Sequence, residues 1–158
     1  MQLDLSILVA SVPERIELLA PLVAELHRQI SDASVELLVL IDNKRRTTGV
    51  KRNALIEQAH GDFVVFVDDD DWIEPDYVDT LRATIAAAPD ADCIVFDVAF
   101  YIDGQFIKTT RSGIEYSWDE DREHFYRRPN PVSGCYARRI SSRHKFLDSS
   151  YGEDTEWS

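Results

Sequence analysis

The sequence has few cysteines, few basic side chains and no long apolar segment. Its two cysteines, Cys93 and Cys135, cannot build a disulfide framework and share no zinc-binding spacing with histidines. This usage is typical of a reducing compartment, so we expect a cytoplasmic protein. The longest apolar runs, Leu37–Ile41 and Phe63–Val67, are far shorter than the about 20 residues that cross a bilayer, and the N-terminus has no signal-peptide pattern. The sequence therefore predicts no transmembrane segment.

Acidic side chains outnumber basic ones, with 29 Asp and Glu against 17 Lys and Arg and a formal net charge of -12. Proteins that bind nucleic acid or anionic membranes do so with clustered Lys and Arg. Neither is therefore an expected partner. The 158 residues, 44% of them apolar, suffice for one domain with a buried core.

Four apolar runs of strand length lie in the first part of the chain. They are rich in Val, Ile and Phe and scarcely alternate with polar residues, which is typical of parallel strands covered by helices on both faces. The predicted strands are Leu5–Val9, Leu37–Ile41, Phe63–Val67 and Ile94–Phe100. The helices between them are predicted from the helical spacing of apolar residues. Thr48 is the expected N-cap of the second helix, and Gly61 is expected to end it in the left-handed region. These helices cover Pro13–Ile30, Gly49–His60 and the segment from Pro75 to about Ile85.

Strands and helices alternate in this way in right-handed, doubly wound α/β sheets. After Tyr101 the pattern changes, because Asp103-Gly104 is a hairpin signal and Pro129 and Pro131 interrupt later segments. We therefore expect an α/β fold with a mostly parallel, doubly wound sheet and a smaller antiparallel C-terminal part. No linker or repeat divides the chain, so residues 1–158 form one predicted domain with halves over about 1–100 and about 101–158.

Four consecutive aspartates, Asp68–Asp71, follow the third apolar run directly. In open α/β sheets, ligands bind outside the carboxyl ends of the strands, where this run is expected to lie. Neighbouring carboxylates repel one another unless a cation neutralises them, and oxygen-only ligands favour Mg²⁺ or Mn²⁺. The run therefore predicts a divalent cation site that also takes a substrate phosphate. The alternative is a solvated acidic turn that stabilises the N-terminus of the next helix.

Several segments resemble, in order along the chain, the motifs of the family 2 glycosyltransferases, which have the GT-A fold. Val67–Trp72 is similar to the family's Asp-X-Asp motif, which ends a hydrophobic strand. Gly49–Ala54 and Ala59–Phe63 resemble the Arg-Asn helix and the Ala-X-Gly-Asp segment that lead into that strand. Gly152–Trp157 resembles the Glu-Asp segment that opens a helix. The resemblance covers nearly the whole chain and implies a GT-A domain whose first half binds the nucleotide and whose second half faces the acceptor.

The resemblance also implies roles for the aspartates. Asp68 would contact the nucleotide ribose, with Asp69 also on the nucleotide-sugar side, and Asp70 would hold the Mn²⁺ or Mg²⁺ ion that bridges the diphosphate. Asp69 and Asp71 form an equally spaced pair, so the register of the motif stays open between Asp68/Asp70 and Asp69/Asp71. Asp42, at the end of the second strand, matches the Asp that contacts the nucleobase, although a turn or capping role explains it nearly as well.

Basic residues near the predicted site suit an anionic diphosphate. Lys51 and Arg52 lie near a predicted helix N-terminus, where dipole and side chains both favour an anion. The alternative is a solvent-exposed basic turn. Ser11 and Arg15 follow the first strand where family members have a Thr and a terminal Arg, and the resemblance implies that Ser11, Arg15 and Arg52 bind the nucleotide sugar. Uridine is the family's default base.

Asp154 matches the family's general base, which removes a proton from the acceptor hydroxyl while the metal stabilises the leaving diphosphate. The alternative for Glu153 and Asp154 is capping of a helix N-terminus. The resemblance ends where Thr155–Ser158 end the sequence, although family members usually continue. We therefore expect either a minimal enzyme or a truncated chain.

Together these residues predict an inverting, metal-dependent glycosyltransferase, inversion being implied by the family. It would move a sugar from a nucleotide-diphosphate sugar, a UDP-sugar by default, to a hydroxyl acceptor on a glycan, a lipid-linked molecule or another compound. One alternative is a nucleotidyltransferase, against which the lack of a Gly-rich phosphate loop after the first strand argues. The other is a non-catalytic subunit that binds sugar nucleotides.

Overall fold

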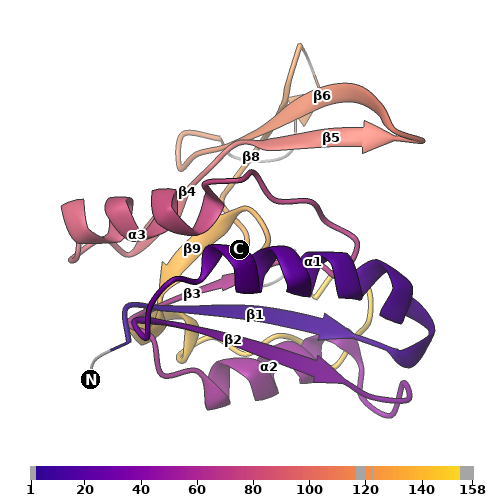
Figure 1. Cartoon of the computed structure of the whole chain (residues 1–158). Coiled ribbons are helices and arrows are strands. Elements are labelled where there is room, and N and C mark those ends of the chain that lie inside the picture. Colours follow the sequence, from indigo (N-terminus) through magenta and orange to yellow (C-terminus); the bar gives the residue numbers. More distant parts are fainter. Residues whose placement is uncertain (1–2, 117–119, 122, 154–158) are drawn as a thin grey trace.

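Two β-sheets make up the fold, and the helices pack on the larger of them (Figure 1). The computed structural model describes residues 3–116, 120, 121 and 123–153. The strands are β1 (Leu5–Ser11), β2 (Val35–Ile41), β3 (Phe63–Phe66), β4 (Cys93–Val95), β5 (Val98–Ile102), β6 (Gln105–Ser112), β7 (Glu120–Asp121), β8 (Phe125–Arg127) and β9 (Gly134–Ala137). The helices are η1 (Pro13–Arg15), α1 (Ile16–Gln29), α2 (Thr48–Gln58), α3 (Tyr77–Ala87) and α4 (Arg138–Ser141). The larger sheet has the strand order β2-β1-β3-β9-β4, and the smaller one has the order β5-β6-β8-β7.

The larger sheet is the middle layer of three. α1 and α3 cover one of its faces and α2 covers the other (Figure 1). Successive side chains of a strand point to opposite faces. Ile7 and Val9 of β1 accordingly belong to the core formed with α1 and α3, whereas Leu8 packs with Leu55 of α2. β1 is a nearly continuous apolar run because both of its faces are buried.

The first three predicted strands and the three predicted helices are confirmed, with small shifts in their bounds. Thr48 is not the N-cap of α2, because Thr47 takes that place and its hydroxyl accepts from the Val50 N–H. β2, β1 and β3 are parallel, and Leu5 lies opposite both Val35 and Phe63. The prediction of one strand over Ile94–Phe100 is wrong, because this segment divides at the exposed Asp97 into β4 and β5, which belong to different sheets. β9 comes from the C-terminal half and lies antiparallel between β3 and β4.

The predicted hairpin at Asp103-Gly104 is confirmed, whereas the predicted left-handed backbone conformation of Gly61 is wrong. The hairpin between β5 and β6 turns at Asp103 and Gly104, with φ angles of 49° and 76°, as two-residue hairpins require. Gly61 has no such angle. A Cβ at Gly61 would lie 2.6 Å from backbone atoms of Leu5 and Ser6, so glycine is needed there for the close approach of β1.

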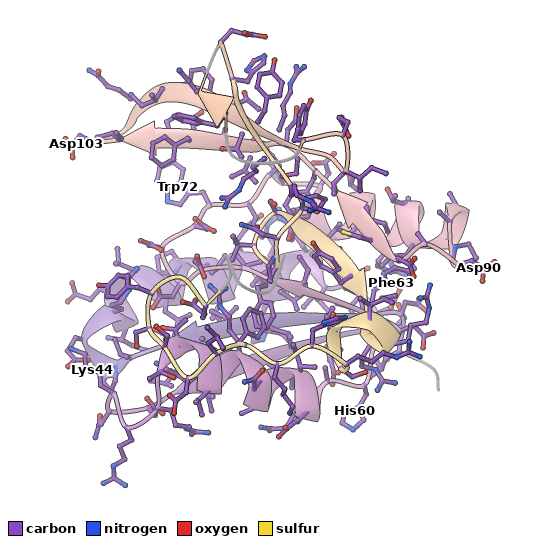
Figure 2. The ribbon with its side chains drawn as sticks, turned by 180° about the vertical axis from the view of Figure 1, so that it is seen from behind. Lys44, His60, Phe63, Trp72, Asp90 and Asp103 are labelled. Carbon is purple, nitrogen blue, oxygen red and sulfur yellow. The ribbon has the colours of Figure 1, made fainter. Side chains whose placement is uncertain are left out.

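The carboxyl ends of β1, β2 and β3 face the same side of the molecule. Figure 2 shows Lys44 and Trp72, which follow β2 and β3, on one side, and His60 and Phe63, near the start of β3, on the other. The loops after the three parallel strands are therefore neighbours, at the edge where open α/β sheets bind ligands. In the described part of the chain, no helix is long and apolar enough to cross a bilayer.

Candidate functional site

The loops that follow β1 and β3 surround a cavity of about 440 Å³, which α2 and the C-terminal segment Ser150–Glu153 complete. Its charged and polar lining side chains are Ser11, Arg15, Thr48, Lys51, Arg52, Asp68, Asp69, Asp70, Ser150, Tyr151 and Glu153. Six of the eight predicted site residues therefore meet at one cavity. The other two are Asp42, which lines a neighbouring cavity, and Asp154, which lies outside the described residues.

Asp69 is held inside the protein by Ser11 and Arg15. The Ser11 hydroxyl donates to Asp69 Oδ2 at 2.5 Å, and Nε and Nη2 of Arg15 each lie 2.8 Å from Asp69 Oδ1. The Asp69 side chain is only 7% exposed. A buried carboxylate is tolerated when it is paired and hydrogen-bonded, and these contacts supply both conditions while joining the end of β1 to the end of β3.

Asp68 and Asp70 differ from Asp69 because about half of each side chain is exposed. Asp70 Oδ2 lies 2.8 Å from Arg15 Nη2, and Asp68 Oδ1 accepts a hydrogen bond from Arg52 Nη2 at 3.1 Å. Both carboxylates line the cavity. The carboxylates of Asp68 and Asp70, two positions apart in the aspartate run, therefore face the same cavity.

Asp71 is the aspartate of the run that does not line this cavity. Its carboxylate turns back and accepts a weak hydrogen bond from the Asp68 backbone N–H at 3.4 Å. The residue is exposed, but neighbouring protein atoms still partly desolvate its carboxylate. That desolvation, followed by repulsion from Asp68, raises the pKa of Asp71 to about 6. Of the two motif registers, Asp68/Asp70 is the one whose members both face the cavity.

Arg52 is buried although it carries a charge. Its guanidinium carbon lies 5.3 Å from the ring centre of Phe66 and 5.6 Å from that of Phe146, within the range of cation–π attraction. Nη2 donates to Asp68, and Nη1 lies 3.6 Å from Glu153 Oε1. Nη1 has no hydrogen bond within the described residues. With Arg52 only 5% exposed, the alternative of a solvent-exposed basic turn is wrong.

Lys51, the neighbour of Arg52, is equally buried and joins the ends of β1 and β2. Its ammonium group donates to the Ser11 carbonyl at 2.9 Å and lies 3.6 Å from Asp42 Oδ1. Arg46 Nε donates to Asp42 Oδ2 at 2.9 Å. Desolvation alone would raise the pKa of Asp42, but the hydrogen bond from Arg46 and the charge of Lys51 outweigh it and lower the pKa.

Asp42 thus stays ionised beside the second cavity, which also measures about 440 Å³. The other residues that line it are Pro13, Ile41, Asn43, Arg45 and Arg46. Lys51 contacts Asp42 of this cavity and is itself part of the wall of the first one. Lys51 therefore connects the wall of the first cavity to Asp42 in the wall of the second.

The segment that precedes Asp154 is anchored on α2. The Asn53 amide donates to the Phe146 carbonyl and accepts from the Phe146 N–H, both at 2.9 Å. The Gly49 N–H donates to the Ser149 carbonyl at 2.9 Å. The helix that supplies Lys51 and Arg52 to the cavity therefore also fixes the path of the chain towards the predicted general base.

The donor set at the cavity suits a hard divalent cation that is shared with a phosphate. Among the residues that the structure describes, no group of three or more His, Cys, Asp or Glu side chains is arranged to hold a metal alone. Mg²⁺ and Mn²⁺ sites often use one or two carboxylates and complete the shell with water and substrate phosphate. Asp70, with Asp68 nearby, fits that pattern.

Two charged residues at this cavity were not among the predicted site residues, Lys51 and Glu153. The sequence placed Lys51 near a helix N-terminus but gave no indication that it contacts both Ser11 and Asp42. The signal for Glu153 was its place in the Glu-Asp segment, where helix capping explained it equally well. The burial of Arg52 would have pointed to Glu153, because a buried guanidinium requires carboxylate partners, but this burial is not visible in the sequence.

Comparison with known proteins identifies the family. The sequence profile described as Glycosyl transferase family 2 matches residues 22–148. That range is most of the chain, and the chain therefore belongs to this family of sugar-transferring enzymes. Ser11, Arg15 and Asp154 lie outside the matched range.

Two relatives share parts of the sequence. The chain is 34% identical over 87 residues to EpsH of Bacillus subtilis (strain 168), a protein assigned as a glycosyltransferase, and the match covers 54% of this chain and 24% of EpsH. It is 37% identical over 61 residues to the glycosyltransferase GlyA of Streptococcus pneumoniae serotype 4 (strain ATCC BAA-334 / TIGR4), covering 39% of this chain and 9% of GlyA. The chain thus spans a quarter or less of these relatives.

Solved structures share the fold. TarS of S. aureus, residues 1–349 in complex with UDP, superposes with a TM-score of 0.66 at 16% identity, over 98% of this chain and 54% of that one. The same protein in complex with UDP-GlcNAc gives a TM-score of 0.56 at 14% identity, over 96% of this chain and 52% of that one. The predicted GT-A fold is confirmed by this likeness and by the family match.

Proposed function

We propose that the chain forms the donor-binding part of an inverting glycosyltransferase that uses a divalent cation to bind a nucleotide-diphosphate sugar. The observation that carries the proposal is the cavity at the carboxyl ends of β1 and β3. It combines half-exposed carboxylates at Asp68 and Asp70 with the cationic side chains Arg15, Lys51 and Arg52. UDP is the proposed nucleotide, because TarS, which has the same fold, binds UDP and UDP-GlcNAc.

The charge of the cavity supports a role for a cation. Three cationic and four acidic side chains line it, so its walls are negative overall. A nucleotide diphosphate is itself an anion and would be repelled without further positive charge. Mn²⁺ or Mg²⁺ held by Asp70 would neutralise the diphosphate and, as a Lewis acid, stabilise the negative charge on the diphosphate when it leaves the sugar. The cation is thus proposed as part of the donor complex.

The protein side chains have separate proposed roles around the donor. Asp68 would accept hydrogen bonds from the ribose, Asp42 would meet the nucleobase in the second cavity, and Arg15 would donate to the diphosphate. Ser11 acts through Asp69, whose carboxylate it helps to hold in place. Arg52, already paired with Asp68, would orient that carboxylate towards the ribose.

Asp154 is proposed as the general base. It would take the proton from the acceptor hydroxyl while that oxygen attacks the anomeric carbon from the side opposite the leaving diphosphate, which inverts the configuration. The hydroxyl acceptor, on a glycan, a lipid-linked molecule or another compound, would enter from the C-terminal half. The cytoplasmic location expected from cysteine usage stays a prediction.

A panel of nucleotides tests the proposal. The midpoint of thermal unfolding is measured with UDP, CDP, GDP and ADP, each with Mn²⁺ and with a chelator in its place. A ligand that binds only the folded state raises this midpoint. We expect UDP with Mn²⁺ to give the largest shift and chelator to abolish it. A larger shift with another nucleotide would contradict the choice of uridine, and no shift with any of them would contradict the site.

A further inference from the structure

Asp70 already has a cation beside it, which is the guanidinium of Arg15. Nη2 of Arg15 lies 2.8 Å from Asp70 Oδ2, while Nε and Nη2 are held by Asp69. We propose that Arg15 is the internal counter-ion of Asp70 and competes with the divalent cation for this carboxylate. The cation then binds tightly only together with the nucleotide diphosphate. This inference rests on the function proposed above.

The position of Arg15 is fixed from two directions. Its backbone ends the turn η1, where the Arg15 N–H donates to the Val12 carbonyl at 3.0 Å and Pro13 restricts the chain. Its guanidinium is held by the buried Asp69, whose other oxygen accepts from Ser11. Arg15 therefore stays beside the aspartate run whether or not a ligand is bound.

The two carboxylates that Arg15 contacts differ in how easily they can lose their contact with its guanidinium. Asp69 is 7% exposed, receives two guanidinium nitrogens and would be left buried without a counter-charge if they moved away. Asp70 is 54% exposed and receives one nitrogen. Water can replace the partner of an exposed carboxylate but not that of a buried one. The contact of Arg15 with Asp70 is thus the releasable one.

A divalent cation and the guanidinium cannot share Asp70 Oδ2 without cost. Mg²⁺ binds carboxylate oxygens at about 2.0–2.1 Å, so it would lie close to the Arg15 nitrogen on the same oxygen and the two positive groups would repel. Binding of the cation alone must displace Nη2 from Asp70, so that this nitrogen loses one of its two carboxylate acceptors and keeps only Asp69 Oδ1. Affinity for the free cation is therefore reduced.

A diphosphate removes this conflict. Its oxygens can accept hydrogen bonds from the Arg15 nitrogen that Asp70 releases, and guanidinium groups bind phosphate well. The same oxygens complete the coordination shell of the cation. Nucleotide and cation therefore strengthen each other's binding, and by linkage the effect is equal in both directions.

The affinity for Mn²⁺ tests the inference without any need for transfer activity. Free Mn²⁺ is followed by electron paramagnetic resonance during titration of the wild-type protein and of Arg15→Gln, each with and without UDP. We expect Arg15→Gln to bind Mn²⁺ alone about tenfold more tightly than the wild type, as loss of one charge-assisted competitor implies. We also expect UDP to strengthen Mn²⁺ binding much less in Arg15→Gln than in the wild type.

Two control variants show whether a gain in Mn²⁺ affinity arises at Asp70. Arg28→Gln removes an exposed positive charge at the other end of α1, where Arg28 pairs with Glu25, and should leave the Mn²⁺ affinity unchanged. Asp70→Asn in the Arg15→Gln background should cancel the gain. If the gain persists without the Asp70 carboxylate, the cation binds elsewhere and the inference is wrong.

The remaining outcomes separate this inference from the proposed function. If the wild type binds Mn²⁺ with UDP but Arg15→Gln gains no affinity for Mn²⁺ alone, competition by Arg15 is refuted and the proposed function stands. If the wild type binds neither ligand under any condition, the proposed function fails and the inference with it. Should Arg15→Gln not fold, the double variant Arg15→Gln/Asp69→Asn is titrated instead, because it also removes the buried carboxylate charge that Arg15 neutralises. It too must bind Mn²⁺ more tightly than the wild type.

Discussion

Arg52 and Glu153 face each other across the cavity wall, with Arg52 Nη1 3.6 Å from Glu153 Oε1 and both side chains only 6% exposed. Arg52 lies on α2 and also donates to Asp68 at the end of β3. The guanidinium therefore connects the chain just before Asp154 to the aspartate run. If Asp154 is the general base, this contact sets the distance between the base and the donor site.

Breaking this buried pair should destabilise the protein. Arg52→Gln removes the guanidinium that contacts the buried Glu153 carboxylate, and we expect a loss of about 3–5 kcal/mol in the free energy of unfolding, measured by urea denaturation. Glu153→Gln leaves Arg52 paired with Asp68, and we expect a smaller loss of about 1–3 kcal/mol. The double variant should lose less than the sum of the two.

Glu57→Gln is the matched control for the previous prediction. Glu57 pairs with Lys145, and both side chains are more than half exposed. Exposed pairs contribute about 0–1 kcal/mol, so this variant should be close to the wild type. Strictly additive losses for Arg52→Gln and Glu153→Gln would show that the two side chains do not interact.

The same substitution should affect stability at Asp69 and ligand binding at the adjacent Asp70. Asp69→Asn removes the charge that pairs with Arg15 in a buried position, so we expect a loss of stability of about 1–3 kcal/mol. Asp70→Asn changes an exposed carboxylate, and we expect normal stability with loss of Mn²⁺-dependent UDP binding in calorimetry. Equal UDP affinity in Asp70→Asn and the wild type would refute the metal role of Asp70.

Asp154→Asn should separate donor binding from transfer. An amide cannot accept the proton of the acceptor hydroxyl, so we expect unchanged UDP affinity and a rate of transfer lower by about 10²- to 10⁴-fold. Asp148→Asn, in the same segment, is the control, because the Asp148 carboxylate accepts from Thr47 Oγ1 and does not line the cavity. Comparable loss of transfer in both variants would point to a disturbed segment rather than to a base.

Glu36 makes stability depend on pH. Partial burial would raise its pKa, but hydrogen bonds from the Ser6 hydroxyl and the His60 N–H, both at 2.6 Å, outweigh this and lower the pKa below the ordinary 4.5. A carboxyl with a lowered pKa in the folded state stabilises the protein above its unfolded pKa, and this contribution is lost as the pH falls through the folded value.

Glu36→Gln should therefore be less stable than the wild type at pH 7, and the difference should shrink as the pH falls below about 4.5. The free energy of unfolding is measured by urea denaturation from pH 7 to pH 3. A constant difference over this range would show that ionisation of Glu36 does not contribute to stability.

The sequence predicted the elements whose signals are local. Leu5–Val9 and Phe63–Val67 are apolar on both faces, as parallel strands require, and Asp103-Gly104 marks the hairpin where the structure has it. β9 could not be predicted in this way. Its place between β3 and β4 depends on antiparallel pairing with strands far earlier in the chain.

The identity of the site residues was predictable, but their surroundings were not. A run of like residues gives no sign that Asp69 is buried while Asp68 and Asp70 face the cavity. That difference arises because Ser11 and Arg15, more than fifty residues away, contact Asp69. Burial of Lys51 and Arg52 likewise depends on segments from both ends of the chain.

Calorimetric titration of UDP into the wild-type protein tests the central claim most directly, that the cavity at the ends of β1 and β3 binds a nucleotide diphosphate through a cation. The titration is performed with Mn²⁺ and repeated with a chelator in its place. We expect one molecule of UDP to bind per chain with Mn²⁺ and no detectable binding with chelator. The claim would be contradicted if UDP bound with equal affinity in both conditions, or if it bound in neither.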